Sequence, residues 1–292
     1  MTAGSASFVC VTCGTNAPSS MDSSLPLETC IICDEPRQHV RRGGQTWTTL
    51  DALKSSGKYK NVFTPTEADP VNMISISTTP SYAIGQRAVL IRTPQGNILW
   101  DCITYIDQET IDEVKRLGGL TAIVISHPHY YSSLKEWSEA FGDIPVYTHK
   151  NDEQWLQRPA KNHVLWEGPT LELMGGSVKV LCPGGHFDGS CLLLWNKNLL
   201  VADTMMVAAS RKSVSFMYSF PNYWPLAPDA VKTIWRSVRP YEVDNILGAW
   251  VGKEIIGQGR NIVYESAKLY TAYSGHDTSK FYSEDAKELA FY

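Results

Sequence analysis

The chain has 292 residues, of which 43% are apolar and 19% are charged, and its formal net charge is −4. This composition is typical of a globular protein that forms one large core, or a core with a small additional domain. It gives no basic surface for nucleic acid, and no apolar stretch reaches the roughly 18 residues that a membrane span needs. The N-terminal sequence MTAGSASFVC has no basic segment followed by an apolar one, so we expect no secretory signal and a cytoplasmic protein.

Four of the seven cysteines form two Cys-x-x-Cys pairs near the N-terminus. Cys10 and Cys13 lie in CVTCG, and Cys30 and Cys33 lie in CIICD. In a reducing compartment, four thiols with this spacing favour a tetrahedral metal site over disulfides. The turn-rich segment between the pairs is too poor in apolar residues to build a core, so the metal would supply its folding energy. The alternative is four unligated thiols in a flexible arm.

We therefore predict that residues 1–45 form a four-cysteine knuckle with its linker, similar to a zinc ribbon or a rubredoxin, and that residues 46–292 form a larger domain. Zinc is the expected ion, although four thiolates would also hold a single iron ion. Because four thiolates leave no open coordination position, this site is predicted to be structural and not catalytic.

After the knuckle, residues 38–70 predict a linker and then a short helix that begins at Thr48 or Thr49. Strand signals become dense from Val71 onward. The first half of the larger domain is predicted to contain a hairpin over 87–102 with Pro94-Gln95-Gly96 at its turn, a helix over 110–118, a buried strand over 120–126, a helix over 132–142 and a strand over 144–149. Ser133 and Glu136 have the spacing of a capping box for the second helix.

The second half repeats this mixture of elements. Residues 177–206 predict three strands with a long loop after the first, residues 227–240 an amphipathic helix, and residues 244–250 a strand. The aromatic segment 216–225 is either a core-packing loop or a lid over a substrate pocket. Strands and helices in both halves predict an α/β sandwich with inner sheets and outer helices.

Two histidines one residue apart, His127 and His129, follow the apolar run 120–126. In an extended chain, residues i and i+2 point the same way, so both imidazoles can face one point. His186 lies in a glycine-rich loop between two predicted strands, where a short backbone lets the ring reach inward. Asp203 ends an apolar strand, where an unpaired buried carboxylate would be costly. These four residues are candidate metal ligands.

This order of features resembles the metallo-β-lactamase superfamily, whose members carry H-x-H-x-D-H at a strand end, a G-H-x-x-G-S-like loop, a strand-ending Asp and a late G-H. The resemblance covers roughly residues 71–260 and implies an αββα sandwich. It places His127 and His129 in the first H-x-H and His186 at the third histidine. Asp203 takes the place of the carboxylate that can bridge two metals. Asp101 resembles the strand-end Asp that supports such a site.

The chain also departs from the pattern of this superfamily. Tyr131-Ser132 stand where the superfamily has Asp-His, and Gly248-Ala249-Trp250 stand where it has its last histidine. Three ligands of the second metal are therefore missing, and we expect one metal at this site instead of two. Ala249 and Trp250 are expected to close the vacated side with apolar surface.

Two further residues near the histidines are candidates for catalysis. Tyr131 occupies the superfamily's Asp position, where it is either a packed aromatic residue or a hydrogen-bond donor to a developing oxyanion. Asp188 follows His186 by two residues, and it either orients an imidazole, carries a proton, or belongs only to a loop turn.

The leading hypothesis is a metal-dependent hydrolase that acts on a small-molecule ester, lactone, amide or thioester. One zinc ion on the three histidines would generate hydroxide at neutral pH, and Asp203 would complete the coordination shell or hold the water as a base. A first alternative is an iron(II) dioxygenase-type enzyme that uses two histidines and Asp203 as ligands. A second alternative is a non-catalytic binding protein with a degenerate site.

Overall fold

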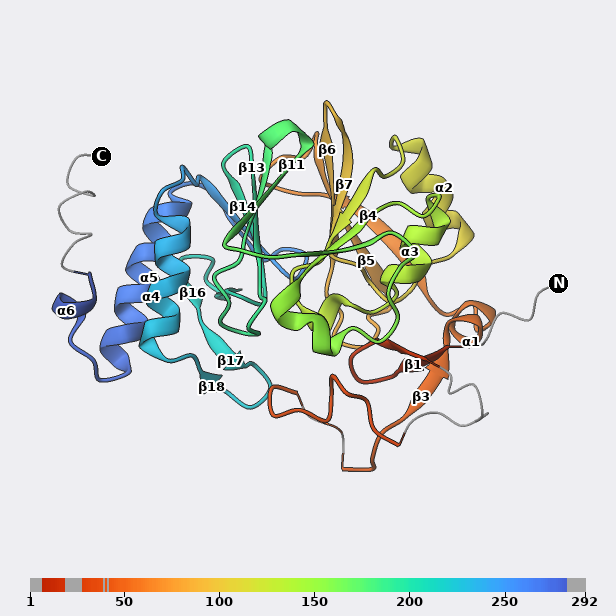
Figure 1. Ribbon diagram of the computed structural model, residues 1–292, viewed down its shortest axis with the longest axis horizontal. Coiled ribbons are helices and arrows are strands. Elements are labelled where there is room, and N and C mark those ends of the chain that lie inside the picture. The colour runs from red at the N-terminus through yellow and green to blue at the C-terminus, as the bar shows by residue number, and fades with distance from the viewer. Residues whose placement is uncertain (1–6, 19–27, 39, 41, 283–292) are drawn as a thin grey trace.

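The computed structural model describes residues 7–18, 28–38, 40 and 42–282. Two large sheets pack face to face, and helices cover the outer face of each sheet (Figure 1). The predicted αββα sandwich is therefore confirmed. Among the described residues, no helix has the length and apolar character to cross a membrane.

The seven-stranded sheet has the order β10-β9-β8-β7-β6-β5-β4. Its strands are β4 (Lys60–Pro65), β5 (Met73–Thr79), β6 (Ala88–Thr93), β7 (Gly96–Trp100), β8 (Ala122–Val124), β9 (Val146–His149) and β10 (His163–Trp166). Neighbouring strands from β4 to β7 are antiparallel, whereas β7, β8, β9 and β10 run parallel. Helices α2 (Gln108–Arg116) and α3 (Leu134–Ala140) lie on its outer face (Figure 1).

The six-stranded sheet has the order β11-β12-β13-β14-β19-β20. Its strands are β11 (Thr170–Leu173), β12 (Val178–Leu181), β13 (Leu192–Trp195), β14 (Asn198–Ala202), β19 (Asn245–Gly248) and β20 (Glu254–Ile255). Helices α4 (Pro228–Val238) and α5 (Gly259–Tyr273) cover its outer face, and α6 (Thr278–Tyr282) follows them. Between these elements lie two small antiparallel pairs, β15 (Met206–Val207) with β16 (Val214–Ser215), and β17 (Met217–Ser219) with β18 (Trp224–Pro225).

The continuous apolar runs of the six-stranded sheet serve two cores because successive side chains point to opposite faces. In β13, Leu193 packs between the two sheets, while Leu192 and Leu194 pack beneath α4 and α5. Leu200 of β14 likewise faces the other sheet, and its neighbour Leu199 faces the helices. Burial on both faces explains why these strands read as unbroken hydrophobic segments.

A buried ion pair joins Arg87, the residue before β6, to Glu254 in β20 of the other sheet. The Arg87 guanidinium donates hydrogen bonds to Glu254 Oε1 at 2.7 Å and to the Gly248 carbonyl at 3.0 Å. The Arg87 backbone N–H also bonds the Ala249 carbonyl at 2.8 Å. These bonds fix the segment that follows β19.

Most of the predicted elements are present with small shifts at their ends. The hairpin β6–β7, the helices α2, α3 and α4, and the strands β8, β9, β12, β13, β14 and β19 lie within the predicted ranges or within two residues of them. Helix α1 (Leu50–Ser55) begins after Thr49, whose hydroxyl accepts a hydrogen bond from the Ala52 N–H at 3.1 Å. Strands β4, β10, β11 and β20 and helix α5 were among the elements that were not predicted.

The capping box predicted for α3 is wrong. The Ser133 hydroxyl donates hydrogen bonds to the carbonyls of Ile103 and Thr104, at 2.9 Å and 3.0 Å, and makes no cap on the helix. The carboxylate of Glu136 instead accepts a hydrogen bond from Arg158 at 2.6 Å. Both side chains therefore bond residues distant in sequence instead of the N–H groups at the start of α3.

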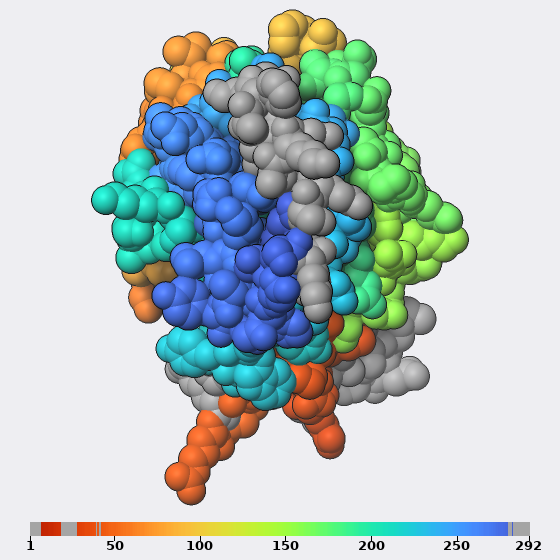
Figure 2. Space-filling view, turned by 90° about the vertical axis from the view of Figure 1, so that its left-hand side faces the viewer, coloured from red at the N-terminus to blue at the C-terminus, as the bar shows by residue number. Residues whose placement is uncertain are grey.

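The N-terminal knuckle is built on a three-stranded sheet of order β2-β1-β3, with β1 (Phe8–Cys10), β2 (Asn16–Ala17) and β3 (Trp47–Thr49). Strand β3 lies beyond residue 45, so this sheet extends across the boundary predicted from sequence. Figure 2 shows the orange-red knuckle directly below the cyan segment that contains β17 and β18.

Candidate metal centres

The four candidate ligands of the larger domain meet at one edge of the sandwich. His127 and His129 follow β8, Asp203 follows β14, and His186 lies in the loop between β12 and β13. Each of these residues is at most 4% exposed. Their ligand atoms all lie within 4.8 Å of one another.

The distances within this cluster suit a single tetrahedral ion. Asp203 Oδ2 lies 3.2 Å from His127 Nε2 and 3.5 Å from His129 Nδ1, and His186 Nε2 lies 3.3 Å from His129 Nδ1. Nitrogen and oxygen ligands about 2.0–2.1 Å from a tetrahedral zinc ion would be about 3.4 Å apart. Asp203 Oδ1 is buried without a hydrogen-bond partner, which is costly for a carboxylate unless a cation is bound nearby. The residues therefore fit one metal ion.

Local backbone geometry aims these side chains inward. His127 has extended dihedral angles, but Pro128–Tyr130 form a 3₁₀ turn, so the expectation of an extended His-x-His was wrong. The two rings meet because the chain turns there. At Asp203, a shift in register between Leu200 and Ala202 interrupts the pairing of β14 with β19, and Ala202 has a φ of 43°. Such irregularities at strand ends commonly redirect a side chain beside a functional site.

Hydrogen bonds to the outer ring nitrogens orient two of the histidines. His186 Nδ1 lies 3.1 Å from the Met217 carbonyl, which can only accept, so Nδ1 carries the proton and Nε2 is free to bind a metal. His127 Nδ1 lies 2.8 Å from the Ser126 hydroxyl. Asp101 Oδ1 accepts a hydrogen bond from the Ser126 N–H at 2.7 Å. Asp101 thus supports the site through Ser126, as the sequence resemblance implied.

Burial and neighbouring charges set the protonation of the cluster. Burial lowers the pKa of His127, and burial together with the neighbouring His129 lowers the pKa of His186 well below its usual range. Burial opposes ionisation of Asp203, but hydrogen bonds with His127 and His129 outweigh it and lower the pKa of this carboxyl. Neutral imidazoles beside an ionised carboxylate are the forms that bind a metal.

Gln86 is a part of the site that sequence reasoning missed. Its Nε2 donates a hydrogen bond to Asp203 Oδ2 at 2.9 Å, and both side chains are buried. No local signal marked it, because Gln86 precedes a strand of the opposite sheet and lies 117 residues from Asp203.

We expect Gln86→Leu to weaken metal binding by roughly 10- to 100-fold, because the Asp203 carboxylate loses the donor that holds its orientation. Competition with a chelator of known affinity measures this change. Gln95→Leu, at an exposed glutamine in the β6–β7 turn, is the matched control and should bind metal like the wild type. Equal affinities in the two variants would show that Gln86 does not position Asp203.

Two predicted catalytic residues lie outside the cluster. Tyr131 is buried, and its hydroxyl donates a hydrogen bond to the Asp152 carbonyl at 3.2 Å, so it packs in the core beside the site and does not border the pocket. Asp188 is exposed. Its backbone carbonyl accepts a hydrogen bond from Asn151 Nδ2 at 3.3 Å. The non-catalytic alternatives given above, a packed aromatic residue for Tyr131 and a loop aspartate for Asp188, describe these positions better than catalytic roles do.

Asp152 is a buried carboxylate that sequence reasoning did not single out. Its Oδ1 accepts a hydrogen bond from the Gly189 N–H at 2.8 Å, and Oδ2 has no partner. A Cβ at position 189 would lie 2.7 Å from Asp152 Cγ, so this contact requires glycine. Burial raises the pKa of Asp152 to about 7. This residue therefore anchors the loop that carries His186.

We expect Asp152→Asn to become increasingly stabilising relative to wild type as pH rises. An unfolded aspartate ionises near pH 4, whereas the folded carboxyl keeps its proton until about pH 7, so the wild-type free energy of unfolding falls across this range. The free energy of unfolding of the variant, relative to that of the wild type, should therefore increase by about 1–3 kcal/mol between pH 5 and pH 8. Urea denaturation at both pH values measures it. Asp112→Asn, at an exposed position in α2, should give no such trend.

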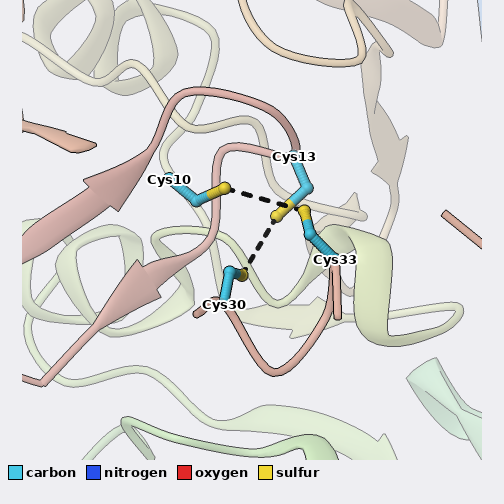
Figure 3. Close-up of side chains that lie close together, drawn as sticks. All are labelled: Cys10, Cys13, Cys30 and Cys33. Atoms are coloured by element: carbon cyan, nitrogen blue, oxygen red, sulfur yellow. Dashed lines mark hydrogen bonds between the residues drawn. The ribbon is translucent and has the colours of Figure 1, made fainter. Parts of the chain in front are cut away.

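The four predicted cysteine ligands converge in the knuckle (Figure 3). All are buried, and none forms a disulfide. Cys10 Sγ lies 3.7 Å from Cys33 Sγ, and Cys13 Sγ lies 3.7 Å from Cys30 Sγ. Sulfurs about 2.3 Å from a tetrahedral ion would be about 3.8 Å apart, so this set also fits a metal. Gln45 Nε2 donates a hydrogen bond to Cys10 Sγ at 3.0 Å, which favours a thiolate there.

A cavity of about 360 Å³ opens beside the histidine cluster. His129, His186 and Asp203 lie in its wall, and Ile84, Met206, Phe220 and Trp250 make much of that wall apolar. Of the two residues expected to close this side, Trp250 lies in the wall, whereas Ala249 is buried in the core. The segment 216–225 borders the cavity through Phe220 and Pro221, while Phe216 packs in the core beneath α5.

No protein-family model matches the sequence. The uncharacterized protein YmaE of Bacillus subtilis (strain 168) is 41% identical over 249 residues, which are 83% of this chain and 88% of that protein.

Solved structures with the same architecture are metallo-β-lactamases. DIM-1 matches with a TM-score of 0.56 and 14% identity, over 73% of this chain and 98% of its own. FIM-1 from Pseudomonas aeruginosa, in its mono-zinc form, matches with a TM-score of 0.55 and 14% identity, over 73% of this chain and 96% of its own. At these identities the likeness establishes the fold.

Proposed function

The chain belongs to the family of Bacillus subtilis YmaE and has the metallo-β-lactamase fold, and from this premise we propose that it is a hydrolase of small carbonyl compounds that depends on one zinc ion at its histidine site. The substrate class is an ester, lactone, amide or thioester. The observation that carries the proposal is the convergence of three imidazoles and one carboxylate on one point beside a cavity.

The surroundings of the cluster support one ion instead of two. Tyr131 and Ser132 stand where further ligands would be expected, but the Tyr131 hydroxyl bonds the Asp152 carbonyl and the Ser132 hydroxyl bonds the Cys102 carbonyl at 3.4 Å. Trp250 presents an indole on the remaining side. A second ion would have little beyond Asp203 to bind it. The fold tolerates this arrangement, since the FIM-1 structure is described as a mono-zinc form.

When bound, zinc lowers the pKa of water towards about 7 and polarises a carbonyl oxygen. The protein's own groups then have distinct tasks. The Met217 carbonyl and the Ser126 hydroxyl hold His186 and His127 in orientation. If the three imidazoles held the ion and left its fourth position to water, Asp203 Oδ1, which has no hydrogen-bond partner, would accept the proton of that water, while Gln86 holds Oδ2.

Elemental mass spectrometry of the purified protein, followed by a screen of ester, lactone, amide and thioester substrates, tests this proposal. We expect two zinc ions per chain, one for each cluster, and hydrolysis that a chelator abolishes and added zinc restores. Iron at the histidine site with oxygen consumption would move the assignment to oxygen chemistry. Three metals per chain would contradict the mononuclear site, and a metal-free, inert histidine cluster would contradict the enzyme.

A further inference from the structure

The cavity beside the histidine cluster has walls from two parts of the chain. One wall belongs to the larger domain and includes Phe220 and Trp250. The other belongs to the knuckle and includes Val11, Thr12 and Gln38. Val11 and Thr12 are the two residues between Cys10 and Cys13, so the first Cys-x-x-Cys loop borders the cavity directly.

Hydrogen bonds fix the knuckle to the β17–β18 hairpin on one side of the cluster. The Tyr218 hydroxyl donates to Glu35 Oε1 at 3.1 Å, and the Ser219 hydroxyl donates to the Arg37 carbonyl at 2.7 Å. Asn222 Nδ2 donates to the Pro36 carbonyl at 2.9 Å. This contact places knuckle residues against the hairpin whose Met217 carbonyl orients His186.

The Arg37 side chain strengthens the same contact. Its guanidinium carbon lies 4.3 Å from the centre of the Phe187 ring and 4.4 Å from that of Tyr218. The Phe187 ring in turn lies 5.0 Å from the His129 ring, centre to centre, and 5.2 Å from that of His186. A knuckle residue therefore packs against the aromatic side chain that backs the metal ligands.

A second anchor lies on the opposite side, near the segment that follows His129. The Asn16 N–H donates to the Ser132 carbonyl at 3.2 Å, and the Thr104 hydroxyl donates to the Gly14 carbonyl at 2.9 Å. A Cβ at position 14 would lie 2.0 Å from the Thr104 hydroxyl oxygen, so the close approach requires glycine. With anchors on both sides, the loop between Cys10 and Cys13 is held over the cavity.

We infer that the first Cys-x-x-Cys loop is a wall of the substrate pocket, that Val11 limits the length of an apolar acyl group there, and that the knuckle keeps this wall in place only with its metal bound. The inference rests on the proposed hydrolase function. The four-cysteine site is then structural for the pocket as well as for the knuckle. The expected substrates carry a short, uncharged acyl chain, since the cavity is small and largely apolar.

The test compares Val11→Phe with Ile31→Phe in the full metal-loaded chain. Ile31 is the matched control, because it holds the same place in the second Cys-x-x-Cys loop, is 39% exposed and borders a hollow beside Trp155. For Val11→Phe we expect the KM of p-nitrophenyl hexanoate to rise by at least about tenfold, with a smaller change for p-nitrophenyl acetate. Ile31→Phe should match the wild type for both esters.

Binding is measured separately from turnover with acetohydroxamate and octanohydroxamate, whose head groups bind metals. The affinity for octanohydroxamate should fall in Val11→Phe and not in Ile31→Phe. If this occurs without ester hydrolysis by any of the proteins, the pocket wall stands and the hydrolase proposal fails. If the wild type hydrolyses the esters but Val11→Phe behaves like Ile31→Phe, the wall inference is wrong and the hydrolase proposal stands.

Hydrogen exchange provides a readout that needs no ligand. In Cys10→Ser, we expect the amides of residues 216–222 to exchange at least about tenfold faster than in the wild type, because the hairpin loses its hydrogen bonds to residues 35–38. Unchanged exchange there would show that the knuckle does not hold this side of the pocket. This result decides whether the metal-bound knuckle holds the pocket wall, even if the wild type neither hydrolyses the esters nor binds the hydroxamates.

Discussion

His186→Ala is expected to remove one of two metal ions per chain and to lower hydrolysis by roughly 10³-fold or more. The variant loses one of the four groups whose spacing fits a tetrahedral ion, so we expect the remaining two imidazoles and carboxylate to bind zinc too weakly to retain it through purification. Water activation is lost with the ion, and that activation is the main chemistry the site supplies. Elemental mass spectrometry and the rate with the best substrate of the screen measure both effects.

Asp188→Asn is the matched control for this variant. Asp188 lies two residues further along the same loop, but its side chain is exposed and outside the cluster. We expect this variant to keep both metals and the wild-type rate. If His186→Ala kept two metals and full activity, the assignment of the histidine site would be wrong. If Asp188→Asn lost activity, the result would support the proton-carrying role that was considered for Asp188 from the sequence.

Cys10→Ser is expected to remove the other metal ion and to unfold the knuckle, while the histidine site keeps its own ion. Cys10 is fully buried, and the knuckle core around it is small, consisting of the four cysteines and Ile32 with a few partly buried neighbours. Structural zinc binding contributes on the order of 10 kcal/mol in comparable small modules, far more than such a core supplies. Limited proteolysis should therefore cut near the N-terminus, and elemental analysis should find one metal per chain.

Cys182→Ser is the control, because Cys182 lies in the larger domain, is only partly buried and belongs to neither cluster. It should keep two metals and resist the protease like the wild type. Two metals in Cys10→Ser would show that the four cysteines do not hold an ion. Cleavage throughout the larger domain would show that the knuckle is needed for more than its own fold.

The sequence by itself determined the two candidate sets of metal ligands in this protein. Two Cys-x-x-Cys pairs, a His-x-His after a buried strand, a histidine in a glycine-rich loop and a strand-ending aspartate are local patterns, and metal coordination restricts the residue types that can form them. The elements around them were also readable, because a strand buried on both faces and an amphipathic helix have different periodicities. The αββα arrangement followed from their order together with the family resemblance.

Only the tertiary structure decided which way the side chains point in the loops that follow the strands. Tyr131 and Asp188 lie within two residues of candidate metal ligands, yet Tyr131 is buried in the core and Asp188 is exposed to solvent. Gln86 reaches Asp203 across 117 residues, and Tyr218 reaches Glu35 across 183. Neither contact produces a periodic or local pattern in the sequence, because each depends on how two distant segments of the chain pack together. For the same reason, the docking of the knuckle beside the histidine site could not be read from the sequence.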